Sequence, residues 1–130
     1  MKLLLDTHIL LWLLKDSPRL GPDARFWITQ ADEVYVSSAS IWEIAIKACL
    51  GKLQVDAEKL TMEMKSLGLL ELPVKNIHAA AVQNLPHYHR DPFDRLLIAQ
   101  SIVEPMRLLT SDSRLTQYSE LVLLCPAGNS

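Results

Sequence analysis

The sequence predicts an α/β protein, a three-layer α/β/α sandwich around a central and mainly parallel sheet, and three observations support this. Short runs rich in Leu, Val and Ile recur along the chain, as in strands that are buried on both faces. These runs alternate with longer segments that carry helix signals, the pattern of right-handed βαβ crossovers. The 130 residues are 49% hydrophobic and 22% charged, so one core and a single domain over residues 1–130 are expected.

In the first half of the chain, turn and capping residues separate the apolar runs. Pro18 lies just beyond the first apolar helix, and Pro22 suits the first turn of the next one. The β-branched Val34 and Val36 indicate a strand, and Gly51 suits the C′ position of the helix that follows. The expected elements are a strand over 2–5, helices over 7–14 and 22–31, a strand over 34–36 and a helix over 38–50.

In the second half, four prolines limit the elements. Pro73 ends a strand and Pro86 ends a short helix, because proline lacks the amide proton that both structures use. Pro92 suits a first helical turn, whereas Pro105 prevents that helix from continuing. The expected elements are a helix over 57–66, a strand over 69–72, a short helix within 77–85, a helix over 92–103, and strands over 107–110 and 121–124.

Charge, cysteine content and the N-terminus limit the classes of function. The formal net charge of −2 gives no overall attraction to nucleic acid, so contact with a polyanion needs a local basic patch or a bound cation. Cys49 and Cys125 are too few for a disulfide framework, and Cys49 is expected to be buried. Asp6 and His8 interrupt the apolar N-terminus, which argues against a signal peptide or a membrane span. We expect a cytoplasmic protein.

Four acidic residues lie where apolar runs give way to turns or helices. Asp6 and Asp112 follow predicted strands, whereas Glu43 and Asp94 fall in the first turns of predicted helices. Parallel strands would bring these positions to one edge of the sheet, and helix dipoles would favour the ionised carboxylates. Because crowded carboxylates repel, they must share protons or hold a cation, which can activate water.

Each acid also has a local explanation that involves no site. The local explanations are capping of helices or turns by Asp6, Asp91 and Asp112, a Ser40–Glu43 capping box, and a Glu43–Lys47 ion pair. Capping alone leaves unexplained why all four acids fall at the same end of the predicted sheet.

Other residues have simpler explanations. His87 and His89 lack the further ligands of a zinc site, so we expect them in a loop near a phosphate. His8 is expected inside the protein or at its edge. Three residues are expected to pack in the core, namely Trp12, Trp27 and Trp42.

Four segments, in order along nearly the whole chain, resemble the PIN-domain family, most closely the VapC-type toxin ribonucleases of type II toxin–antitoxin systems. They are LLDTH at 4–8, SSASIWEI at 37–44, RDPFDRLLIAQ at 90–100 and TSD at 110–112. The resemblance implies the α/β/α sandwich, a ribonuclease that depends on Mg²⁺ or Mn²⁺, neutralisation by a small antitoxin protein, and a homodimer.

The resemblance also implies roles for individual residues. Asp6, Glu43, Asp94 and Asp112 match the catalytic acidic quartet of the family. Within it, Asp6, Asp94 and Asp112 would hold the Mg²⁺ or Mn²⁺ ion, and Glu43 would orient or deprotonate the attacking water. Asp91 and Ser37 would support these ligands from outside. The basic residues that would meet RNA follow no shared motif of the family. Apart from the resemblance, the candidate phosphate contacts are Lys47, Lys52, Arg90, Arg95 and Arg114.

Two other functions stay open at this point. A metal-dependent phosphatase or phosphoacceptor domain also gathers aspartates at strand ends, but it needs a lysine after a late strand, and no lysine follows Leu109. A non-catalytic protein-binding module would use apolar surfaces alone, for example around Trp12 and Trp42. Binding of Mn²⁺ would separate such a module from an enzyme.

Overall fold

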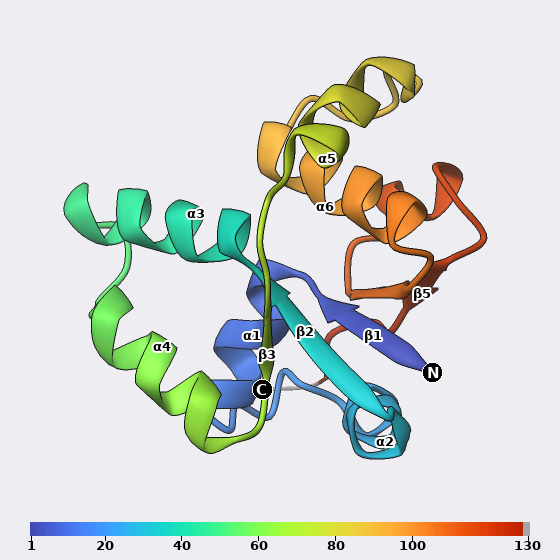
Figure 1. Cartoon of the computed structure of the whole chain (residues 1–130). Helices are drawn as coiled ribbons and strands as arrows, with labels where there is room; N and C mark the ends of the chain where they lie inside the picture. The colour runs from blue at the N-terminus through green and yellow to red at the C-terminus, as the bar shows by residue number, and fades with distance from the viewer. Residues whose placement is uncertain (129–130) are drawn as a thin grey trace.

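A five-stranded sheet lies between two layers of helices in the computed structural model, which describes residues 1–128 (Figure 1). The strand order is β3-β2-β1-β4-β5, and all four neighbouring pairs are parallel. The strands are β1 (Lys2–Leu5), β2 (Glu33–Ser37), β3 (Leu70–Leu72), β4 (Arg107–Thr110) and β5 (Val122–Leu124). From β1 the chain adds β2 and β3 on one side of the sheet and then β4 and β5 on the other side. The direction of winding therefore switches next to β1, and α/β proteins place their binding sites at such a topological switch point.

The helices fall close to the predicted ranges. They are α1 (Thr7–Leu14), α2 (Pro22–Gln30), α3 (Ser38–Cys49), α4 (Ala57–Ser66), α5 (Asn76–Ala81) and α6 (Pro92–Val103). Gly51 follows α3 with a φ of +74°, which confirms the predicted left-handed stop. The short helix predicted within 77–85 is divided into α5 and the 3₁₀ helix Val82–Asn84, and the 3₁₀ helix Ser113–Gln117 was not predicted. Such pieces are too short to show a helical period in the sequence.

The core has one part on each face of the sheet, which confirms the three-layer prediction. Side chains alternate along β1, so that Leu3 and Leu5 pack with the apolar residues of α1 to α4. Leu4 points to the other face, where it belongs to the same cluster as Leu97 and Ile98 of α6. The central strand is therefore buried on both sides, as its unbroken run of leucines predicts.

Two predictions of burial are wrong. Cys49 is exposed at the C-terminal end of α3. His8 is exposed on α1, so of the two places expected for it the structure has the edge of the protein and not the interior. Trp42 is 59% exposed, whereas Trp12 and Trp27 pack partly against the core. The reason is that α3 buries the face that carries Ala39 and Ile44 and leaves other apolar residues at the surface. Within residues 1–128, no helix has the length and apolar character needed to cross a bilayer.

Candidate active site

The four predicted acids meet at the edge formed by the carboxyl ends of β1, β2 and β4. The register places Leu5 of β1 level with Val36 of β2 and Leu109 of β4. Asp6 therefore emerges between the two neighbouring strands, and its amide donates a 3.0 Å hydrogen bond to the Leu109 carbonyl. Glu43 and Asp94 come from α3 and α6, and Asp112 comes from the turn after β4.

Asp6 lies at the base of this site and is almost fully buried. One carboxylate oxygen accepts a 3.0 Å hydrogen bond from the Ile9 amide, so Asp6 also caps α1. The Thr110 hydroxyl donates a short hydrogen bond to the other oxygen. Burial raises the pKa of Asp6 in spite of these hydrogen bonds, and the charge of Glu43 raises it further. Thr110 was not predicted as a site residue.

Glu43 is buried and held by a short polar chain. Its Oε1 lies 2.7 Å from the Thr7 hydroxyl, and its Oε2 accepts a 2.8 Å hydrogen bond from Lys47. Thr7 has a single hydroxyl proton, so when it donates to Glu43 the Ser40 hydroxyl, 3.0 Å away, must donate to Thr7. The Glu43–Lys47 pair was predicted. The Ser40–Glu43 capping box was wrong, because Ser37 caps α3 by accepting from the Ala39 amide.

Asp94 lies in the first turn of α6, and Asp91 caps that helix as predicted. Asp91 accepts hydrogen bonds from the Phe93 amide at 2.9 Å and the Asp94 amide at 3.0 Å. Burial raises the pKa of Asp94 to about 6, and the charges of Asp91 and Asp6 contribute in the same direction. We expected the helix dipole to keep this carboxyl ionised. Burial and the neighbouring acids outweigh that effect in the metal-free protein.

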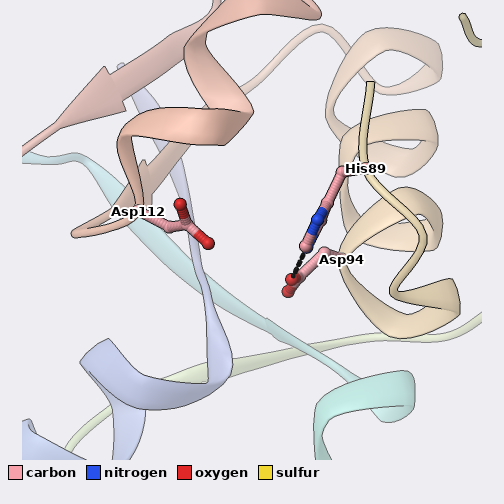
Figure 2. Close-up of side chains that lie close together, drawn as sticks. All are labelled: His89, Asp94 and Asp112. Atoms are coloured by element: carbon pink, nitrogen blue, oxygen red, sulfur yellow. Dashed lines mark hydrogen bonds and ion pairs between the residues drawn. The ribbon is translucent and has the colours of Figure 1, made fainter. Parts of the chain in front are cut away.

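Asp112 occupies the turn after β4 and is paired with a cation. Its Oδ1 accepts from the Arg114 amide at 2.9 Å, and its Oδ2 accepts from the Arg114 guanidinium at 2.8 Å. These hydrogen bonds hold the pKa of Asp112 below its ordinary value. Asp112 thus caps the turn, as its local explanation predicted, and its carboxylate also faces Asp94 (Figure 2).

His89 lies beside the acidic residues of the site, whereas the sequence predicted only that it lies in a loop near a phosphate. Figure 2 shows its imidazole beside the Asp94 carboxylate, with Asp112 facing both. The distance from His89 Nε2 to Asp94 Oδ2 is 2.8 Å. One ligand atom from each of His89, Asp94 and Asp112 lies within 4.8 Å of the other two. The only signal in the sequence was the position of His89 just before the Asp91 cap.

Arg95 does not fulfil its predicted role as a phosphate contact. It is buried, and its guanidinium donates to the Pro86 carbonyl at 2.8 Å and the Tyr118 hydroxyl at 3.2 Å. The Tyr118 hydroxyl in turn accepts a 2.7 Å hydrogen bond from the His89 amide. Arg95 therefore holds the loop that presents His89. Among the other predicted contacts, Lys52 and Arg90 are exposed, and the Arg114 side chain is 65% exposed beside Asp112. Lys47 is half-buried and paired with Glu43.

The donor atoms at this edge fit a divalent cation. Carboxylate oxygens dominate the set and are the ligands of Mg²⁺ and Mn²⁺, and Mn²⁺ also accepts an imidazole nitrogen. The raised pKa values of Asp6 and Asp94 show that negative charge is costly here. A cation would favour the ionised carboxylates that burial disfavours.

Comparisons with known proteins agree with this geometry. The PIN domain family model matches residues 3–121. The chain is 30% identical over 121 residues to Ribonuclease VapC22 of Mycobacterium tuberculosis, covering 88% of this chain and 90% of that protein.

Solved structures share the fold at low sequence identity. VapBC2 from Rickettsia felis, bound to a DNA fragment from their promoter, superposes with a TM-score of 0.68 and 14% identity over 98% of this chain and 99% of that one. FitAcB from Neisseria gonorrhoeae gives a TM-score of 0.61 and 16% identity over 95% and 97% of the two chains. At this level of identity the likeness concerns the fold alone.

Proposed function

Because this chain belongs to the PIN-domain family, we propose that it is a ribonuclease that hydrolyses RNA phosphodiester bonds with the help of Mg²⁺ or Mn²⁺. The observation that carries the proposal is the convergence of His89, Asp94 and Asp112 beside Asp6 and Glu43 at the switch point of the sheet. The 30% identity to a protein named as a ribonuclease supports the choice of RNA as substrate.

In this proposal Asp6, Asp94 and Asp112 hold the ion, and His89 either adds a nitrogen ligand or orients Asp94. A bound divalent ion would supply a water of lowered pKa and would screen charge that builds up on the phosphate. Glu43 takes the proton from the attacking water, because its carboxylate is buried and aligned by Thr7 and Lys47. Asp91 supports Asp94 by fixing the first turn of α6.

We further propose that the protein acts as a toxin held in check by an antitoxin, and that it forms a homodimer. The support for the antitoxin is that the structures similar to this chain include a toxin–antitoxin complex from Klebsiella pneumoniae, with 14% identity and a TM-score of 0.63. The homodimer rests on the resemblance to the family alone. Co-expression with the gene next to its own, followed by size-exclusion chromatography with light scattering, tests both statements. A monomer that elutes without a partner contradicts them.

Metal removal tests the enzymatic proposal directly. The protein should cleave a fluorescent single-stranded RNA in Mn²⁺ or Mg²⁺, and a chelator should stop the reaction, since the proposed reaction needs an ion to lower the pKa of the attacking water and to screen charge on the phosphate. Cleavage that continues in the chelator contradicts metal dependence. Phosphorylation of Asp6 by a small phosphodonor would favour a phosphoacceptor domain, and absence of Mn²⁺ binding in calorimetry would favour a non-catalytic module.

His89 offers a test of the ligand set. Replacing His89 with Ala should raise the Kd for Mn²⁺ by about 10- to 100-fold, the usual cost of losing a ligand or a group that orients one. Isothermal titration calorimetry measures this. His87→Ala is the matched control, because His87 is exposed in the same loop, and it should leave the Kd unchanged. If the two variants had the same Kd for Mn²⁺, His89 would neither bind the metal nor orient a ligand.

A further inference from the structure

A second hollow adjoins the acidic site and shares Asp112 with it. Its volume is about 460 Å³, within the range of about 300–1,000 Å³ typical of small-ligand pockets. It is lined by His8 and Trp12 of α1, by Arg19, and by the turn Ser111–Ser113 after β4. An occupant of this pocket would therefore lie directly beside one of the proposed metal ligands.

The pocket contains three flat groups, with the Trp12 ring near both the Arg19 guanidinium and the His8 ring. The Arg19 guanidinium carbon is 5.1 Å from the centre of the Trp12 ring. The His8 ring centre is 6.1 Å from that of Trp12, and the two planes are tilted by 32°. His8 and Arg19 are exposed, whereas Trp12 packs partly against the core behind them. Exposed aromatic rings and guanidinium planes are the surfaces on which unpaired RNA bases stack.

The charge of Arg19 is available to a ligand. Among residues 1–128, no carboxylate lies within 4.0 Å of its guanidinium. Arg25 and Arg114, by contrast, are paired with Asp16 and Asp112. A free arginine stacked on an aromatic ring can contact a phosphate and stack on a base at the same time. The polar turn Ser111–Ser113 suits a nucleotide better than an apolar protein segment.

We propose that this pocket binds the nucleotide next to the scissile phosphodiester, with its base on His8 and Arg19 and a phosphate on Arg19. The inference rests on the proposed ribonuclease function and extends it, because it assigns a substrate-binding role to residues outside the acidic quartet. It also identifies the substrate as single-stranded, since only an unpaired base can enter the pocket and stack.

Binding of uncleaved RNA provides the test. In an Asp94→Asn background with chelator present, fluorescence anisotropy with a labelled single-stranded octaribonucleotide measures affinity without hydrolysis. His8→Ala and Arg19→Gln should each raise the Kd roughly 5- to 100-fold, as expected for the loss of one stacked base. Lys59→Gln removes an exposed positive charge on α4, outside the pocket, and it should change the Kd less than about twofold. If Lys59→Gln and Arg19→Gln raised the Kd equally, Arg19 would contribute only general electrostatic attraction to RNA and the proposed nucleotide site would be wrong.

Tryptophan fluorescence gives a second readout. RNA should quench the emission of the protein, because a stacked base lies against the cluster that contains Trp12. Trp12→Phe should abolish most of this quenching and still fold, whereas Trp42→Phe should retain it, since Trp42 lies outside the pocket. Circular dichroism establishes that each variant is folded. If the quenching remained in Trp12→Phe and disappeared in Trp42→Phe, RNA would bind near Trp42 and not in this pocket.

Kinetics separates failure of this inference from failure of the proposed function. In the cleavage-competent protein, His8→Ala and Arg19→Gln should raise KM more than they lower kcat. If the unaltered protein cleaves RNA and these variants match it in Kd and KM, the pocket is not a nucleotide site and the ribonuclease proposal stands. If the unaltered protein neither binds nor cleaves RNA, the proposed function itself is wrong.

Discussion

Asp94→Asn should reduce RNA cleavage by at least ~10³-fold, because it removes a charged ligand from a site where the metal contributes several kcal/mol to transition-state stabilisation. The same change should stabilise the metal-free protein. Burial and the charges of Asp91 and Asp6 raise the pKa of Asp94 to about 6, so ionising this carboxyl costs free energy in the folded state. At pH 7 the neutral amide should raise the free energy of unfolding by about 1–3 kcal/mol.

The pH dependence of stability checks the sign of this effect. Between pH 3.8 and about 6 the folded protein retains a proton on Asp94 that the unfolded chain has released. The contribution of Asp94 to the free energy of unfolding should therefore fall as pH rises through this window and stay level above it. Urea titrations at several pH values in chelator measure this. The slope should be smaller in Asp94→Asn, and the part that remains should include the contribution of Asp6, whose pKa is also raised by burial.

Asp23 supplies a matched control for Asp94. It too lies in the first turn of a helix that begins with proline, but it is exposed and outside the site. Asp23→Asn should keep full activity and should lose a few tenths of a kcal/mol of stability, because it removes a favourable charge from a helix N-terminus. Unchanged activity in Asp94→Asn, or a lower free energy of unfolding at pH 7, would contradict the role given to Asp94.

Arg95→Met should cost about 2–4 kcal/mol of folding stability and should also impair activity. Its guanidinium donates to the carbonyls of Pro86 and Leu85 and to the hydroxyl of Tyr118, and methionine cannot replace these hydrogen bonds. The loop that carries His89 would then lose its fixed position. Denaturant unfolding measures the loss of stability. The displaced loop should weaken metal binding, which calorimetry would detect as a higher Kd for Mn²⁺.

Arg90→Gln is the comparison that separates structure from substrate binding. Arg90 is exposed, so its loss should change stability by less than ~0.5 kcal/mol and affect KM if it contacts RNA. If Arg95→Met were as stable as the unaltered protein and only KM changed, Arg95 would contact phosphate after all.

Much of the fold could be predicted because each signal is local. The unbroken leucines of β1, the proline at the start of α6 and Gly51 after α3 all act within one or two turns of chain. The approach of the four acids also followed from the sequence, since parallel strands deliver their carboxyl ends to one edge. The short 3₁₀ helix Ser113–Gln117 and the exposure of Cys49 escaped, because neither follows from a periodic pattern.

The details of the site depend on contacts between residues that are far apart in the chain. Thr7 and Glu43 are separated by 36 positions, and Asp6 and Thr110 by 104. No local pattern links such pairs. Arg95 was misjudged for the same reason, since a basic residue in a helix gives no sign that it will be buried under a loop.

Local signals are enough to predict which elements form and which carboxylates reach the edge of the sheet, because capping, apolar periodicity and strand direction are properties of short segments. The packing of the layers brings His89 to Asp94 and Asp112 and raises the pKa of Asp94 by burial. It also places Arg95 where its guanidinium holds a loop. Desolvation and hydrogen bonding depend on every neighbour in space, and those neighbours are set when the layers pack.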